Sequence, residues 1–172
     1  MTGKANILSV VAMAWVMHLL PDRFFVTSAS ASSNVSDLNA FDAALIKMGI
    51  GEQNLVAVSS VIPAGAEEVP VTDMPMGAVT HCVLSQVRGG EGERIAAGIA
   101  YAFRKDGNGG YVAEGRIRGP GTLTDDLRMK MEGIAAARNI ELNEIRYVTA
   151  EMTVPAGQYG ACAAALVFTG YE

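Results

Sequence analysis

Short β-type runs that recur along most of the chain constrain its fold more than any other feature. Apolar and β-branched residues fill seven runs, at 24–30, 54–62, 78–87, 94–103, 111–117, 144–153 and 159–169. Polar or glycine-rich turns separate the runs, such as 105–110, whose residues tolerate positive φ. Two helical segments interrupt the series. The pattern predicts an α+β fold, a layered sandwich of mainly antiparallel strands with two amphipathic helices.

The two helical segments carry periodic apolar residues and end signals. The first spans 37–48 and stops at Gly49, and its apolar stripe is expected to consist of Leu38, Phe41, Leu45 and Met48. Thr124 is expected to cap the second helix, with Asp125 and Asp126 in the first turn, where the helix dipole favours anions. The buried stripe of this helix is expected to be formed by Leu127, Met131 and Ile134.

Composition indicates one folded domain. The chain has 172 residues, of which 50% are hydrophobic and 18% charged. A net charge of −5 provides no basic surface for phosphates, so we expect no nucleic-acid partner. Cys82 and Cys162 lie in apolar runs and are expected to be buried thiols. The two histidines, His18 and His81, are far apart in the sequence, so we expect no metal site.

The N-terminus is apolar over residues 5–20. Sixteen residues fall short of the roughly 20 that a membrane-spanning helix needs, so we expect no membrane partner and a cytoplasmic protein. We interpret 1–20 as an extension to a domain at 21–172, either a helix lying on the domain or an over-long gene start before Met13 or Met17. The alternative is export, with 29–31 imitating a signal-peptidase site.

A serine pair at the end of a strand-like run is the chemically informative feature. No GxGxxG, P-loop, GxSxG or HExxH motif is present. Ser59-Ser60 begins the segment SSVIP at 59–63, which follows LNAFDAAL at 38–45, GIG at 49–51 and Asn54-Leu55. PMGA at 75–78 and GACAAAL at 160–166 come later. Together these segments, over about residues 21–170, resemble the pyruvoyl-dependent arginine decarboxylase family.

The resemblance implies a carbon–carbon lyase that converts L-arginine to agmatine and CO2. It implies self-cleavage between Ser59 and Ser60 into chains 1–59 and 60–172, with a covalent pyruvoyl group formed from Ser60. A serine pair suits this chemistry, because the Ser60 hydroxyl can attack the Ser59 carbonyl, and β-elimination and hydrolysis then leave a ketone at position 60. The ketone accepts electrons during decarboxylation, as pyridoxal phosphate does elsewhere.

The resemblance also assigns roles to three polar residues. Glu114 is the expected general acid that protonates the product carbanion. Asp42 is the expected partner of the guanidinium, to which a carboxylate can offer two parallel hydrogen bonds. Asn54 is expected to polarise the scissile carbonyl or to orient the substrate. From the residues alone, the preferred interpretation of Glu114 is an outward residue of an amphipathic strand, and the alternative for Asp42 is a solvated helix residue.

The expected partner is a small amino-acid substrate, and the resemblance implies a homotrimer or a dimer of trimers with active sites between subunits. Arg116 and Arg118 lie close to Glu114 in the sequence, where an arginine enzyme would want fewer cations. Decarboxylation of another amino acid, such as histidine, therefore stays an alternative. A second alternative is an uncleaved, exported binding module.

Overall fold

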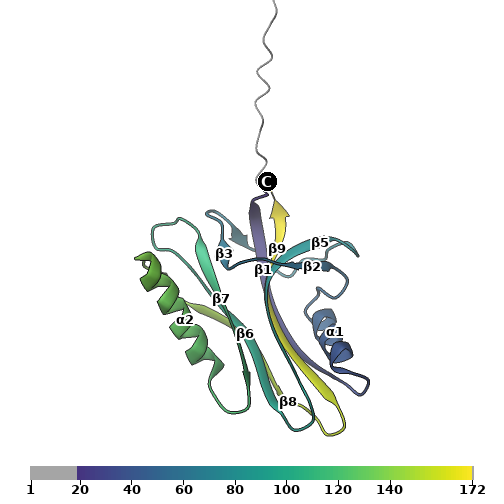
Figure 1. The fold of residues 1–172 in the computed structure, drawn as a ribbon. Helices are drawn as coiled ribbons and strands as arrows, with labels where there is room; N and C mark the ends of the chain where they lie inside the picture. The colour runs from purple at the N-terminus through teal and green to yellow at the C-terminus, as the bar shows by residue number, and fades with distance from the viewer. Residues whose placement is uncertain (1–18, 172) are drawn as a thin grey trace, which may run out of the picture.

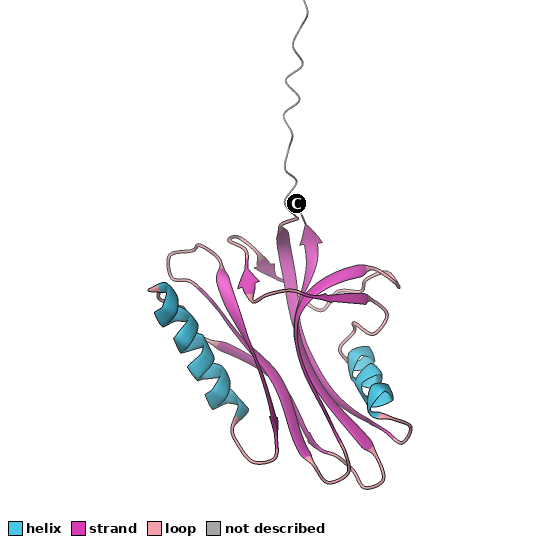
Figure 2. Ribbon diagram, viewed as in Figure 1, coloured by secondary structure: helices cyan, strands magenta, loops and turns pink. Residues whose placement is uncertain are grey.

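The computed structural model of the protein describes residues 19–171. Two β-sheets lie face to face, and one helix covers the outer face of each, so that the layers run helix, sheet, sheet, helix (Figures 1 and 2). The predicted α+β sandwich is confirmed. Residues 1–18 lie outside the described part, and with them most of the predicted extension.

The first sheet has five strands in the order β2-β5-β9-β1-β4. β9 lies antiparallel between β1 and β5, whereas β4 and β2 pair with their neighbours in parallel. The bounds are β1 Pro21–Ser33, β2 Asn54–Ala57, β4 Glu67–Glu68, β5 Val79–Gly89 and β9 Tyr159–Tyr171.

The second sheet has four strands in the order β3-β7-β6-β8, and all its pairings are antiparallel. The turn between β6 and β7 uses Gly107 and Gly109 at positive φ (78° and 82°), as the glycine-rich segment 105–110 predicts. The bounds are β3 Val61–Ile62, β6 Arg94–Phe103, β7 Gly110–Arg118 and β8 Arg146–Thr153.

The main core lies between the two sheets. Phe24 and Leu166 of the first sheet meet Ile99 and Val112 of the second, and all four side chains are fully buried. Burial of a side chain of this size contributes about 1.5–3 kcal/mol. Cys162 belongs to a second cluster of buried residues, and Cys82 to a cluster beneath the first helix, so the prediction of two buried thiols is confirmed.

Helix α1 (Asp37–Lys47) covers the outer face of the five-stranded sheet. The Ser36 side chain accepts the backbone N–H of Asn39 at 3.1 Å and so caps the helix. The predicted stripe is wrong at Leu38, which is 61% exposed. The helix instead buries two of its alanines, Ala40 and Ala44, which lets its backbone approach the alanine-rich strand β9 closely and turns Leu38 toward solvent.

Helix α2 (Leu123–Arg138) covers the outer face of the four-stranded sheet. Its cap is Thr122 and not Thr124 as predicted. The helix begins earlier because the buried side chain of Leu123 packs against the sheet together with the first turn. The predicted stripe is otherwise confirmed, since Leu127 and Met131 are fully buried and Ile134 packs against them.

The predicted strand at 54–62 is two strands, because β2 and β3 belong to different sheets. The short strand β4 was not predicted, and it consists of two exposed glutamates, Glu67 and Glu68, paired with the edge of β1. Both differences arise from pairing with distant segments. Ser59 and Ser60 lie in the break between β2 and β3.

Candidate active site

Ser59 and Ser60 lie where the chain crosses from one sheet to the other. On the β2 side, the backbone N–H of Val58 donates to the carbonyl of Cys82 at 3.0 Å and extends the pairing with β5. On the β3 side, the Ser60 carbonyl accepts the N–H of Val112 on β7 at 3.1 Å. The Ser59–Ser60 peptide bond therefore links the sheets and lies in neither strand, so its cleavage would break no strand pairing.

A tight turn surrounds Ser60. The carbonyl oxygen of Ser59 accepts the backbone N–H of Val61 at 3.1 Å, a contact from residue i to residue i+2 that folds three residues into a γ-like turn. This N–H withdraws electron density from the Ser59 carbonyl carbon, the atom that a neighbouring serine hydroxyl would attack. Ser59 is exposed and Ser60 is half-buried.

Ser60 and Glu114 line the same pocket, which has a volume of about 460 Å³. β7 brings them together, because its register sets Ser60 against Val112 and Glu114 follows two residues later on the same face of the strand. Two residues of extended strand span roughly 7 Å. A pocket of this size, lined by residues that include Ser60 and Glu114, can hold a small polar molecule.

Helix α2 supplies two cations to this pocket that sequence reasoning missed, Lys130 and Arg138. The Lys130 ammonium donates to the Glu114 carbonyl at 2.9 Å and forms an ion pair with Asp126 at 2.6 Å. The Arg138 guanidinium lies over the ring of Tyr111, 4.6 Å from its centroid. The sequence gives one signal for these cations, the i, i+4 spacing of Asp126 and Lys130. That spacing indicates an ion pair on a helix surface and does not indicate an active site.

Close packing fixes α2 against the strand that carries Glu114. Gly98 of β6 and Gly115 of β7 are directly paired. A Cβ atom at Gly115 would lie 2.9 Å from the Leu123 side chain and 3.0 Å from that of Leu127. The missing side chains at the two glycines therefore let the first turns of α2 sit directly on the sheet beside Glu114.

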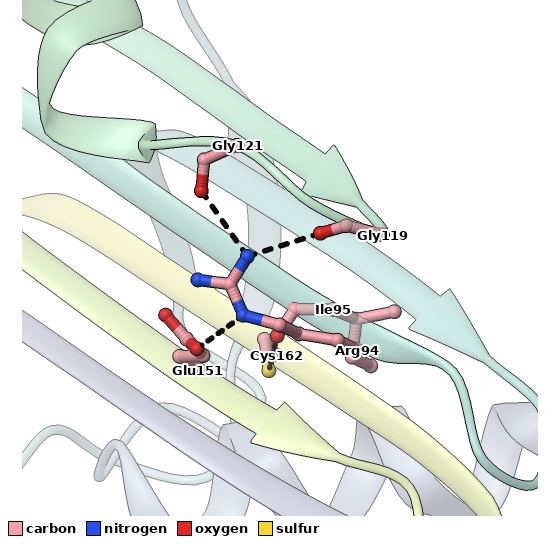
Figure 3. A network of polar contacts seen from close by, with 6 residues as sticks. All are labelled: Arg94, Ile95, Gly119, Gly121, Glu151 and Cys162. Carbon is pink, nitrogen blue, oxygen red and sulfur yellow. Dashed lines mark hydrogen bonds and ion pairs between the residues drawn. The ribbon is translucent and has the colours of Figure 1, made fainter.

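Arg94 holds the loop that leads into α2 (Figure 3). Its Nη1 donates to the carbonyls of Gly119 and Gly121 at 3.0 and 3.1 Å, and its Nε donates to Glu151 of β8 at 2.6 Å. One guanidinium thus ties β6 and β8 to the connection between β7 and α2. The start of α2, and through it Lys130, is positioned by this contact.

Asn54 lies at the first residue of β2. Its side-chain amide donates to the Gly77 carbonyl at 2.8 Å, and its backbone N–H donates to the Ala78 carbonyl at 2.9 Å. Five residues of extended chain, roughly 16 Å, separate Asn54 from Ser59. Within one protomer Asn54 therefore anchors the 75–78 segment to β2 and does not line the Ser60 pocket.

A family model of pyruvoyl-dependent arginine decarboxylase matches residues 23–172. The chain belongs to the pyruvoyl-dependent arginine decarboxylase family. The predicted family, a lyase that depends on a covalent pyruvoyl group, is thereby confirmed.

Three curated relatives, each named pyruvoyl-dependent arginine decarboxylase, match nearly all of their own length. The protein of Thermococcus kodakarensis is 35% identical over 160 residues, which cover 91% of this chain and 99% of the relative. That of Pyrococcus horikoshii is 35% identical over 162 residues with the same two coverages. That of Methanopyrus kandleri is 31% identical over 152 residues, covering 88% of this chain and 99% of the relative.

The described residues fit the family's covalent group. A pyruvoyl group made from Ser60 would lie at the crossover between the sheets, in the pocket that Glu114 and Lys130 line. Arg116 lines a neighbouring pocket of about 680 Å³ together with Glu114 and Lys130, whereas Arg118 lies 3.7 Å from Glu93 in a surface ion pair.

Asp42, the expected guanidinium partner in this decarboxylase family, is not near Ser60 within one protomer. It is exposed on α1, on the outer face of the five-stranded sheet, and it lines none of the pockets that contain Ser60 or Glu114. Its neighbours one turn away, Leu38 and Ile46, are 61% and 56% exposed. No helix within residues 19–171 is long and apolar enough to cross a membrane.

Proposed function

We propose that this protein converts L-arginine to agmatine and CO2 with a pyruvoyl group formed from Ser60 when the Ser59–Ser60 bond is cleaved into chains 1–59 and 60–172. The single observation that carries the proposal is the shared pocket of Ser60 and Glu114 at the crossover between the sheets. When present, the pyruvoyl group supplies the electron sink for decarboxylation. Relatives named for this activity over almost their whole length support the choice of substrate.

Glu114 delivers a proton to the substrate carbon after CO2 has left. Its strand is fixed by pairing to β6 on one side and by the Lys130 contact to its carbonyl on the other. Its side chain lies on the same face of β7 as that of Val112, whose N–H holds the Ser60 carbonyl. The carboxyl group is thus carried on a rigid element beside the reacting position, as proton transfer requires.

A second copy of the chain supplies Asp42. Leu38, Asp42 and Ile46 follow one another at i, i+4 and i+8 and form a line on the exposed face of α1. Two exposed aliphatic side chains that flank a carboxylate suit burial against a partner better than exposure to water. A homotrimer, or a dimer of trimers, that covers this line would bring Asp42 of one copy to the Ser60 pocket of the next. The role of Asn54 in orienting the substrate stays a prediction.

Residues 1–20 are proposed to be an extension that catalysis does not need, and the cytoplasmic location stays a prediction. The family match begins at residue 23. A protein lacking residues 1–20 should therefore self-cleave, assemble and turn over arginine at rates within about threefold of the full chain. Loss of cleavage in the truncated protein would contradict this part of the proposal.

A panel of amino acids assayed for CO2 release tests the substrate. Arginine should be the best substrate and agmatine the product. Lysine should be poor, because an ammonium cannot form the planar two-bond pair with a carboxylate that a guanidinium forms. Faster release of CO2 from histidine or aspartate than from arginine would overturn the arginine assignment.

Complementation between two inactive variants tests the shared site. Ser60→Ala lacks the cofactor precursor but keeps Asp42, and Asp42→Asn keeps Ser60 but lacks the carboxylate. If Asp42 acts across subunits, co-expression of the two should give mixed oligomers with a measurable fraction of wild-type activity, although each variant alone is inactive or weak. Activity no higher than that of Asp42→Asn alone would mean that Asp42 does not act in a neighbouring copy.

A further inference from the structure

A separate pocket lies on the Ser59 side of the scissile bond. It has a volume of about 430 Å³ and combines Ser59 with His81 and Tyr171 among apolar side chains that include Val58, Pro63 and Phe168. Ser60 and Glu114 do not line this pocket, and Ser59 does not line the pocket that contains Ser60 and Glu114. The two serines therefore open onto different environments, and the turnover proposed above uses only the Ser60 side.

His81 and Tyr171 form a tight pair in this pocket. The Nδ1 atom of His81 lies 2.6 Å from the Tyr171 hydroxyl, and the two rings meet edge to face with centroids 5.6 Å apart. Burial raises the pKa of the Tyr171 phenol, so it keeps its proton at neutral pH. A phenol that donates to Nδ1 leaves the hydrogen of a neutral imidazole on Nε2, so the tautomer in which Tyr171 donates is the one that turns an N–H donor away from the pair.

Strand pairing brings His81 to the segment that ends in Ser59. β2 runs parallel to β5 with Val56 opposite His81 and Ala57 opposite Cys82. The N–H of Val58 donates to the Cys82 carbonyl at 3.0 Å and continues this pairing to the residue before Ser59. The imidazole is therefore held beside the chain that carries the Ser59 carbonyl.

The first two steps of self-cleavage both place negative charge on the Ser59 oxygens. In the first, Ser60 Oγ bonds to the Ser59 carbonyl carbon through an oxyanion, the C–N bond breaks, and the hydroxyl proton passes to the released amine. In the second, the Cα proton of residue 60 is lost to water and the Cβ–Oγ bond breaks. The electrons of that bond leave with Ser59 as a carboxylate. A fixed hydrogen-bond donor near these oxygens lowers both barriers.

We propose that the His81–Tyr171 pair is the charge-stabilising group of self-cleavage, with Tyr171 holding the imidazole so that Nε2–H donates toward the Ser59 oxygens. This inference rests on the proposed function, because it assigns a role within the cleavage that makes the cofactor. The backbone N–H of Val61 already contacts the Ser59 carbonyl. The His81 imidazole would be a second donor, in the pocket that Ser59 lines and Glu114 does not.

Cleavage kinetics test the pair directly. The full chain is made by cell-free translation with a radioactive label, synthesis is stopped, and the cleaved fraction is followed on denaturing gels. His81→Ala should cleave about a hundredfold more slowly than wild type, the usual cost of removing one oxyanion donor. Tyr171→Phe should slow cleavage roughly three- to tenfold, because it removes one hydrogen bond that orients the ring. Tyr147→Phe, at an exposed tyrosine on β8, is the matched control and should cleave as wild type does.

Rescue separates a chemical role from a structural one. His81→Gln keeps an N–H donor and should recover part of the rate, and added imidazole should accelerate His81→Ala in proportion to its concentration. Slow cleavage that neither change restores would assign His81 a structural role and overturn the proposal, as would wild-type cleavage in His81→Ala. A wild-type chain that never cleaves would overturn the proposed function as well. Failure of the His81 proposal alone is recognised because the wild-type chain still cleaves.

Discussion

The carbonyl oxygen of Ser60 accepts the backbone N–H of Val112 at 3.1 Å, two residues before Glu114 on the same strand. One short contact thus ties the position that is to become the cofactor to the strand that carries the proposed acid. Ser59 lines a different pocket, together with His81 and Tyr171. Formation of the cofactor and turnover of the substrate should therefore respond to different substitutions.

Glu114→Gln should separate the two processes. The amide has nearly the same shape as the carboxyl group, so the chain should still cleave, but it cannot donate the proton that the product carbon needs. Loss of one positioned general acid typically lowers the rate about 10²–10⁴-fold. The measurement is kcat for CO2 release per mole of pyruvoyl group.

Glu132→Gln, an exposed carboxylate elsewhere on α2, serves as the control and should behave as wild type. Turnover of Glu114→Gln within threefold of this control would assign the proton donor to another residue.

Asp42→Asn should weaken arginine use while leaving cleavage at Ser59–Ser60 intact. Hydrogen bonds to charged groups contribute about 1.5–3 kcal/mol, or roughly ten- to 150-fold in kcat/KM. The matched control is Asp37→Asn, on the same helix, whose carboxylate forms an ion pair with Arg88 at 3.6 Å. Unchanged kcat/KM for arginine in Asp42→Asn would refute the guanidinium pairing.

Two glycine substitutions near α2 should change stability in opposite directions. Gly115→Val forces a side chain against Leu123 and Leu127 and should destabilise the protein by about 1–3 kcal/mol. Gly133→Ala lies within α2, where an added Cβ meets no atom within 4 Å, and should stabilise the helix by about 0.8–1.0 kcal/mol. Urea unfolding of both variants checks the pair. A stable Gly115→Val protein would mean that α2 does not pack on β7 as described.

The buried thiols should make the protein less stable at high pH. Burial raises the pKa of Cys82 and of Cys162 from 9.0 to about 11. Because the folded-state pKa lies above the unfolded value, this contribution is fully present below pH 9 and is lost as the pH rises through 11. Urea unfolding between pH 8 and pH 11 should therefore show a steeper loss in wild type than in a variant with alanine at both positions. Equal slopes would contradict the burial of the thiols.

Local pattern was sufficient for the parts of the fold that local forces determine. The strand at 94–103 was predicted with its observed bounds, because its apolar run ends at polar turns on both sides. The predicted stripe of α1 failed at Leu38, since the spacing of large apolar residues does not reveal that Ala40 and Ala44 face the sheet. The break of 54–62 into two strands depends on pairing with β5 and β7, which no local pattern encodes.

The candidate site divides in the same way. Ser59, Ser60 and Glu114 were found through the resemblance of ordered motifs, and the fold brings the last two into one pocket. His81 and Tyr171 are 90 residues apart in the sequence and meet only because β5 and β9 are adjacent. Lys130 and Arg138 carry no signal beyond a charged helix surface, and their place beside Ser60 follows from the packing of α2 on Gly98 and Gly115.

The intact mass of the purified protein tests the central claim most directly. Wild type should give two polypeptides that end at Ser59 and begin at position 60, the second lighter by the mass of ammonia than a chain that begins with an unmodified serine. Ser60→Ala should give one chain of full mass, because it lacks the attacking oxygen. A wild-type protein that stays a single intact chain, with no ketone that borohydride reduces, would contradict the proposed function.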